Sequence, residues 1–147
     1  IKFRTMSPPG GFTYNGVMTI QQDNEGFIWV LTDEELYNFD GYTYKRHSSY
    51  FKEINPKIHW YFLNLTLNKS GEIIVNTNNG LFKYNRVSDK FSLLTDISVE
   101  TTFIDPQNQI WLRKNGKWGK LPHVKRVQEF SRFFTLFVPY SVKEGDF

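Results

Sequence analysis

Histidines and carboxylates are the residues of this chain whose types could support catalysis or metal binding, because its 147 residues contain no cysteine. The three histidines, His47, His59 and His123, lie far apart and lack the short spacing of paired metal ligands. The acidic run Asp33-Glu34-Glu35 falls in an expected turn, where carboxylates are solvated, whereas catalytic carboxylates need opposed positions across a substrate. The glycines form no phosphate-binding motif. We therefore predict no catalytic residue, no metal site and no cofactor.

A sequence repeat organises the elements that would position any other site. Three segments align without gaps: VMTIQQDNEGFIWVLT at 17–32, FLNLTLNKSGEIIVNT at 62–77 and VETTFIDPQNQIWLRK at 99–114. The period is 45 residues and then 37. Equivalent positions in this alignment are Asp23, Asn68 and Asp105, then Gly26, Gly71 and Asn108, and then Trp29, Ile74 and Trp111. A period of this length is typical of repeat architectures.

Each copy of the repeat is consistent with four short antiparallel strands. In the first copy the turn Asp23–Gly26 has Asp first and Gly last, and the following segment Phe27–Thr32 suits a strand buried on both faces. Asp40-Gly41 is a strong signal for a two-residue hairpin turn. The high aromatic share, 18%, also favours β structure, and no long segment shows a helical period. We expect an all-β chain.

Four antiparallel strands repeated at about forty residues describe the blade of a β-propeller. The fold is therefore expected to be a β-propeller fragment of about three and a half four-stranded blades, in which residues 1–147 are part of one domain. The blades are placed at 17–46, 60–94 and 99–128, with the start of a fourth blade at 132–147 and a ring-closing strand at 1–5. Because exposed strand edges recruit neighbours, we also expect self-association.

The repeat register also predicts the core. A position that accepts Trp29, Ile74 and Trp111 is a packing position, so all three side chains are expected to be buried. The same register predicts that further apolar residues lie near them: Ile20, Val30, Leu65, Val75, Phe103 and Leu112. The hydroxyls of Thr32 and Thr77 are expected to hold the backbone of the turns that follow.

Aromatic residues occur in the long connections that lead into the first strands. Recognition often lies in loops on a rigid scaffold, and aromatic rings there can stack against sugar faces while their polar tips bond hydroxyls. The candidate ligand-binding residues are Tyr14, Tyr50, His59, Trp60 and Tyr61. The alternative is that Trp60 and Tyr61 begin a first strand and pack inward.

The first copy resembles the two-component-regulator propeller repeat. The resemblance lies in Asn15-Gly16-Val17, in Asp23-x-x-Gly26-Phe27-Ile28-Trp29-Val30-x-Thr32 and in Leu36-x-x-Phe39-Asp40-Gly41-Tyr42-x-Tyr44. It implies the N-terminal periplasmic sensor region of a Bacteroides-type hybrid two-component system, an inner-membrane protein in which a histidine kinase follows. Since the propellers of this family sense glycans, the resemblance implies an oligosaccharide ligand, with the rest of the propeller and the kinase as partners. Leu31 and Glu35 depart from the pattern, which often has Gly at both places.

Three functional hypotheses follow. The preferred one is a non-catalytic sensor module that recognises a glycan and relays a signal to the kinase. The alternative is a propeller-fold enzyme that acts on polysaccharide, which rests only on the many chemistries that one fold can carry. The basic run from Arg113 to Arg126 suits nucleic acid, but such runs are usually solvated faces, so no nucleic-acid partner is expected. No membrane span is expected either, because the longest nearly apolar stretch, 133–140, is far shorter than the roughly twenty residues required.

Overall fold

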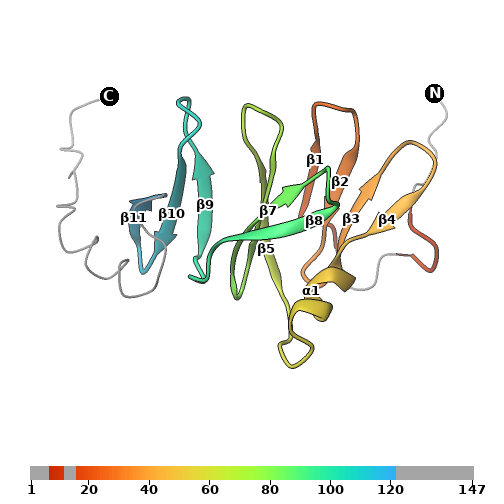
Figure 1. The fold of residues 1–147 in the computed structure, drawn as a ribbon, viewed down its shortest axis with the longest axis horizontal. Coiled ribbons are helices and arrows are strands. Elements are labelled where there is room, and N and C mark those ends of the chain that lie inside the picture. The colour runs from red at the N-terminus through yellow and green to blue at the C-terminus, as the bar shows by residue number, and fades with distance from the viewer. Residues whose placement is uncertain (1–6, 12–15, 122–147) are drawn as a thin grey trace.

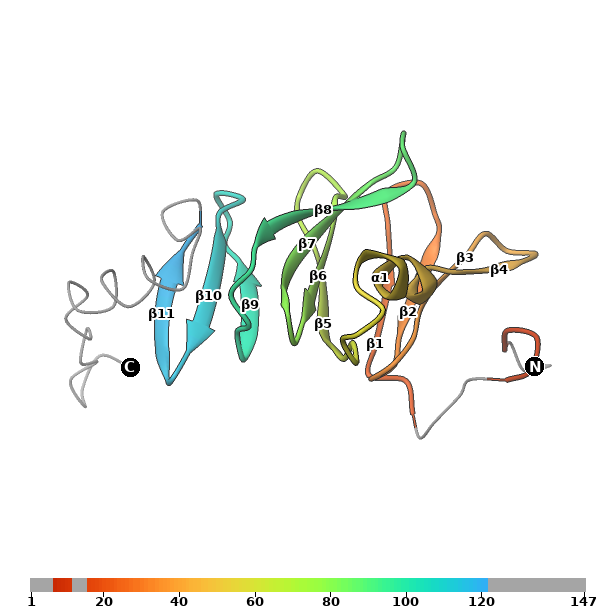
Figure 2. The same ribbon diagram turned by 60° about the horizontal axis from the view of Figure 1, so that its bottom comes forward.

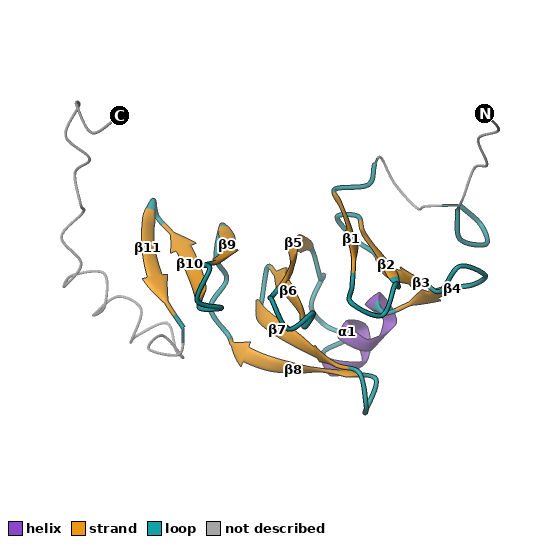
Figure 3. Cartoon of the chain, turned by 90° about the horizontal axis from the view of Figure 1, so that it is seen from above, coloured by secondary structure: helices purple, strands orange, loops and turns teal. Residues whose placement is uncertain are grey.

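Three antiparallel sheets follow one another in the computed structural model, which describes residues 7–11 and 16–121 (Figure 1). Sheet 1 has the order β1-β2-β3-β4, sheet 2 the order β5-β6-β7-β8 and sheet 3, in the described residues, the order β9-β10-β11. The strands of sheet 1 are β1 (Thr19–Gln22), β2 (Ile28–Leu31), β3 (Leu36–Phe39) and β4 (Tyr44–Arg46). Those of sheet 2 are β5 (Phe62–Leu67), β6 (Ile73–Thr77), β7 (Gly80–Asn85) and β8 (Lys90–Thr95). Those of sheet 3 are β9 (Thr101–Ile104), β10 (Ile110–Lys114) and β11 (Lys117–Lys120). The sheets stand side by side in chain order (Figures 2 and 3).

The expected β-propeller-fragment fold is confirmed, but the expectation of an entirely β chain is wrong in one detail. A helix, α1 (Ser48–Ile54), lies in the connection from sheet 1 to sheet 2. It places Phe51 in the core, where the ring contacts Phe62, Phe82 and Phe91 at centroid distances of 5.1, 5.1 and 4.9 Å. With seven residues, this helix is too short to produce a helical period in the sequence.

Several predictions fall on residues outside the described part of the chain. These are the ring-closing strand at 1–5, the start of a fourth blade at 132–147 and the end of the third blade beyond residue 121. Sheet 3 therefore has three described strands where four were expected. The extent of one domain over residues 1–147 and the self-association of the chain stay predictions. In the described residues, no helix combines the length and the apolar character that crossing a bilayer requires.

The turns between the first two strands of each sheet share one hydrogen-bond pattern. In sheet 1 the Asp23 amide donates to Phe27 O and the Gly26 amide donates to Asp23 O, both at 3.0 Å. The equivalent pairs are Asn68 to Glu72 (3.1 Å) and Gly71 to Asn68 (2.9 Å) in sheet 2, and Asp105 to Gln109 (3.0 Å) and Asn108 to Asp105 (2.9 Å) in sheet 3. Gly26, Gly71 and Asn108 all have positive φ, which Gly and Asn adopt most readily. The repeat register is confirmed at these turns.

In sheets 1 and 2 the turns between the second and third strands are held by threonine hydroxyls, as expected. Thr32 Oγ1 donates to Glu35 O at 3.3 Å and accepts from the Glu35 amide at 2.9 Å. Thr77 Oγ1 donates to Gly80 O at 2.9 Å. Both threonines are fully buried, so the hydroxyls also satisfy turn backbone that water does not reach.

Two apolar clusters fill the spaces between neighbouring sheets. The cluster between sheets 1 and 2 includes Trp29, Leu65, Val75 and Phe51, and the cluster between sheets 2 and 3 includes Ile74 and Leu112. Val30 is also buried, so these parts of the predicted core are confirmed. Each sheet buries side chains against its neighbour, as expected for stacked repeats that cannot bury their faces alone.

Three of the predicted core residues are not fully buried. Ile20 is 61% exposed and Phe103 is 51% exposed, and Trp111 is only half-buried. Phe103 pairs with Trp111 on the face of sheet 3 opposite Leu112, which packs toward sheet 2. Ile20 pairs with Val30 on the face of sheet 1 opposite Trp29. The prediction failed because a single register cannot tell which faces another sheet covers.

Candidate functional site

The structure separates the four described aromatic candidates into core residues and surface residues. Tyr14 lies outside the described residues. Tyr50, on α1, packs against the core and donates its hydroxyl to Phe91 O at 2.9 Å. Trp60 is 7% exposed and donates Nε1 to Asn55 O at 3.2 Å. These two rings are engaged in packing, and a ligand-binding role for any of the five residues stays a prediction.

His59 and Tyr61 lie together on the surface. Their ring centroids are 4.5 Å apart, and His59 Nε2 lies 3.2 Å from Glu34 Oε1 in the turn between β2 and β3. Asn78 fixes the backbone of this connection, since its Nδ2 donates to His59 O at 2.8 Å and its Oδ1 accepts from the Tyr61 amide at 3.0 Å. Two turns from different sheets thus hold the exposed rings of His59 and Tyr61 beside the Glu34 carboxylate. Together these three side chains can offer a ligand ring contacts as well as hydrogen bonds.

A buried carboxylate joins sheets 1 and 2, and the sequence analysis missed this role. Asp23 Oδ2 accepts from Trp29 Nε1 at 2.7 Å and from Arg86 Nη2 at 2.7 Å, while Oδ1 accepts from two amides of its own turn. Burial alone would raise the pKa of Asp23, but the hydrogen bonds from Arg86 and Trp29 outweigh it and hold the pKa below its usual value. The ion pair between Arg86 and Asp23 therefore links sheet 2 to sheet 1.

The aspartate–tryptophan part of this arrangement recurs in sheet 3. Asp105 Oδ2 accepts from Trp111 Nε1 at 2.8 Å, and Oδ1 accepts from the amides of Gln107 and Gln109. Sheet 2 has Asn68 and Ile74 at these positions, so the bond is absent there. The signal for it was an Asp and a Trp six residues apart in two of the three copies.

Glu35, which was expected to be solvated with Asp33 and Glu34, is buried. Its carboxylate accepts from Arg46 Nε at 2.6 Å, pairs with the second Arg46 nitrogen Nη2, and accepts from the Ser48 hydroxyl. The prediction was wrong because these partners, eleven and thirteen residues away, compensate a carboxylate that the turn alone would leave to water. Glu35 thereby fastens the turn after β2 to β4 and to the start of α1.

His47 is an uncharged histidine in the space between sheets 1 and 2. It is 4% exposed, stacks on Trp29 at 4.9 Å and meets Tyr84 and Phe91 edge-on at 5.3 and 5.8 Å. Its Nε2 has no hydrogen-bond partner among the described residues. Burial lowers the pKa of His47 to about 4, a shift that Asp89 opposes and Lys45 adds to.

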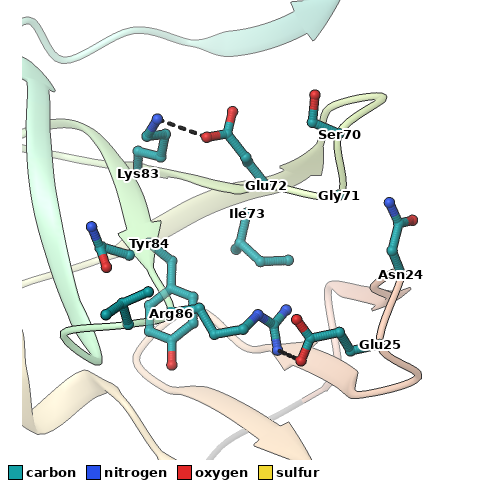
Figure 4. Close-up of a pocket in the computed structure, with 11 residues that line it drawn as sticks. Asn24, Glu25, Ser70, Gly71, Glu72, Ile73, Lys83, Tyr84 and Arg86 are labelled. Carbon is teal, nitrogen blue, oxygen red and sulfur yellow. Dashed lines mark hydrogen bonds and ion pairs between the residues drawn. The ribbon is translucent and has the colours of Figure 1, made fainter.

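A polar groove lies between the turns of sheets 1 and 2, at the opposite end of the strands from α1 and the His59–Tyr61 pair. One cavity of about 360 Å³ lies between the β1–β2 turn, the β5–β6 turn and the segment after β7 (Figure 4). A second cavity of about 420 Å³ shares Glu25, Tyr84 and Arg86 with it. Each volume is within the roughly 300–1,000 Å³ of small-ligand sites. Figure 4 shows the Lys83–Glu72 pair and the Arg86–Glu25 pair on its two sides.

Comparisons with known proteins agree with the repeat and the fold. Among solved structures, the chain is similar to the extracellular domain of the putative hybrid two component system BT4673 from B. thetaiotaomicron, with 17% identity and a TM-score of 0.53 over 71% of this chain and 14% of that chain. It is likewise similar to a structure described as the extracellular domain of the putative one component system BT4673 from that organism, with 16% identity and a TM-score of 0.55 over 71% of this chain and 15% of that one.

These structural similarities establish the fold, and the chain spans only 14–15% of the length of the two solved chains. A search of curated proteins gives no match. Residues 11–34 match the family described as "Two component regulator propeller". This segment contains the turn Asp23–Gly26, Trp29 and Thr32, whose hydrogen bonds recur in the other sheets. Residues 11–34 are therefore similar to the two-component regulator propeller repeat, and the sheets around them share the fold of propeller domains.

Proposed function

We propose that the chain is a non-catalytic sensor module, the N-terminal part of the periplasmic propeller of a hybrid two-component sensor in the inner membrane. It recognises an oligosaccharide and, with the rest of the propeller, relays the signal to a histidine kinase. The family match at residues 11–34 supports the sensor assignment. The similar fold of the extracellular domain of a putative hybrid two component system supports the location.

The exposed pair His59 and Tyr61 is the observation that carries the recognition part of this proposal. Tyr61 is 44% exposed, so part of its ring is available to the apolar face of a sugar. Glu34, next to His59, supplies a carboxylate acceptor for a sugar hydroxyl. Asn78 holds the connection in place, which limits the entropy that ordering the loop would cost on binding.

Replacing both His59 and Tyr61 by alanine is expected to weaken oligosaccharide binding by about tenfold or more, because stacking and a hydrogen bond are lost together. The measurement is isothermal titration calorimetry of the intact chain with a panel of oligosaccharides. Tyr42→Ala is the matched control, since Tyr42 is 93% exposed and lies at the hairpin turn between β3 and β4. Unchanged binding by the double variant would remove the recognition role of this pair.

The purified chain is expected to release no reducing sugar from polysaccharides. A glycosidase keeps one carboxylic acid protonated by raising its pKa. Among the residues that the structure describes, hydrogen bonds and ion pairs instead hold five carboxyl groups below their usual pKa: Asp23, Asp40, Glu72, Asp89 and Asp105. Measurable turnover of a polysaccharide in a reducing-end assay would favour an enzyme over a sensor.

A further inference from the structure

We propose that the turn between β10 and β11 is a site of self-modification, at which the Asn115 side chain loses ammonia and becomes aspartate or isoaspartate. Asn115 and Gly116 are the two residues of this turn, and Lys114 pairs with Lys117 across it. Both turn residues have positive φ, 51° and 72°, as the favoured two-residue hairpin turn with Asn-Gly requires. The inference does not depend on the proposed function.

The reaction needs only these two residues and water. The Gly116 backbone nitrogen loses its proton and attacks Cγ of Asn115, so that a new C–N bond closes a five-membered succinimide ring. The bond from Cγ to Nδ2 breaks, and Nδ2 leaves as ammonia. Water then opens the ring at either carbonyl carbon, which gives aspartate or isoaspartate, and the second product carries the main chain through Cγ. The sum is one amide and one water converted to one carboxylic acid and one ammonia, with no change of oxidation state.

The turn leaves both reacting groups accessible. Asn115 and Gly116 are exposed, and the space in which a side chain of residue 116 would lie contains no atom within 4 Å. Nothing therefore crowds the attacking nitrogen. Among the described residues, neither the Asn115 side chain nor the Gly116 amide has a hydrogen-bond partner that would hold it away from the other.

Ring closure requires the turn to leave its conformation for a moment. Besides the pairing of Lys114 with Lys117, one contact opposes this movement, because the Asn115 backbone amide donates to Glu100 Oε1 at 2.7 Å. The Glu100 side chain is itself about half exposed, at 48%. Exposed turns with few contacts open locally at a small cost in free energy.

A second Asn-Gly pair, Asn79-Gly80, has the same two residue types in a different environment. The equivalent turn of sheet 2 consists of Asn78 and Asn79, so Gly80 already belongs to β7 and pairs with Thr77. Gly80 is buried, and a side chain there would lie only 2.3 Å from Thr95 O. The Asn79 peptide is therefore protected by the sheet, whereas the Asn115 peptide is not.

The modification changes the contact between the turn and the start of sheet 3. It replaces a neutral amide by a carboxylate, so the formal net charge falls by one, from +3 to +2. The new charge lies on the residue whose amide donates to the Glu100 carboxylate, and like charges repel. Isoaspartate also lengthens the main chain within a two-residue turn, whose geometry sets the register of β10 and β11.

The test incubates the intact chain at pH 8 and 37 °C, once folded and once in denaturant. A protease that cuts after glutamate then releases residues 73–100 with Asn79 and residues 101–129 with Asn115. Mass spectrometry with fragmentation measures the exchange of amide for acid in each peptide and locates it, and chromatography separates the aspartate and isoaspartate forms. Asn115→Gln is the control, since glutamine keeps the amide but would have to close a less favourable six-membered ring. Circular dichroism verifies that the variant is folded.

We expect Asn115 to react at least about tenfold faster than Asn79 in the folded chain, because a local opening that costs 1.4 kcal/mol more slows a reaction tenfold. In denaturant the two sites are expected to react at similar rates, since each asparagine precedes glycine. The folded Asn115→Gln variant is expected to show no acid at residue 115. Equal rates at Asn79 and Asn115 in the folded chain, or acid found in residues 101–129 only at Asn108, would overturn the inference.

Discussion

Replacing Trp29 by alanine is expected to lower the free energy of unfolding by about 3–5 kcal/mol. Trp29 is fully buried between sheets 1 and 2, where its ring stacks on His47 and meets Tyr84 edge-on at 5.0 Å. Its Nε1 also donates to Asp23, the carboxylate that Arg86 of sheet 2 reaches. The substitution therefore leaves a cavity between sheets 1 and 2. It also removes one of the hydrogen bonds that orient the Asp23 carboxylate toward Arg86. Chemical denaturation of the intact chain measures the loss.

Trp111→Ala is the matched control for this prediction. Trp111 makes the same bond to Asp105 at the equivalent position of the repeat, but it is only half-buried. Its removal is expected to cost at most about 2 kcal/mol, because less apolar area leaves water on folding. If Trp29→Ala cost less than about 1 kcal/mol, Trp29 would not be part of the core, and an equal loss for the two variants would show that burial does not set the difference.

The parts of the fold that could be predicted from the sequence are those that local chemistry determines. The turn after the first strand needs a side-chain acceptor at its start and a residue with positive φ at its end, so Asp23 with Gly26, and Asp105 with Asn108, mark it in the sequence. Repetition of this turn then indicates the strands on either side of it. The register of the sheets follows from the same positions.

The contacts that join different sheets could not be predicted in this way. Arg86 reaches Asp23 across 63 residues of sequence, and no repeat position indicates that pairing. The same limit explains why Ile20 and Phe103 were expected in the core, since the register gives the face of a residue but not what covers that face.

The candidate site shows the same division between local and long-range information. His59 and Tyr61 are near neighbours in the sequence, so their proximity on the surface could be expected. The packing of Tyr50 and Trp60 against the core depends instead on rings from α1 and sheet 2, such as Phe51, Phe82 and Phe91. The groove combines three segments that are distant along the chain, and no single motif indicates it.

Acidification from pH 7 to pH 5 is expected to lower the free energy of unfolding by about 2 kcal/mol through His47. Burial lowers the pKa of His47 in the folded chain to about 4, whereas an unfolded histidine has a pKa near 6.5. Below pH 6.5 the unfolded chain therefore binds a proton that the folded chain does not, and stability falls as the pH falls. The loss from this residue reaches about 3 kcal/mol near pH 4 and levels off at lower pH, where the folded imidazole is protonated as well. Chemical denaturation at a series of pH values measures it.

His47→Phe is the control, because phenylalanine keeps a ring against Trp29 and Tyr84 without a group that binds a proton. The variant is expected to lose most of the stability change between pH 7 and pH 5. The lowered carboxyl pKa values, such as those of Asp23 and Asp89, act at lower pH, since the unfolded carboxyl groups take up protons only near their usual pKa of about 4. An unchanged slope between pH 7 and pH 5 in His47→Phe would show that another group is responsible. A flat profile in the parent chain would show that the buried imidazole is protonated as readily as in the unfolded chain, which the unpartnered Nε2 between three aromatic rings makes unfavourable.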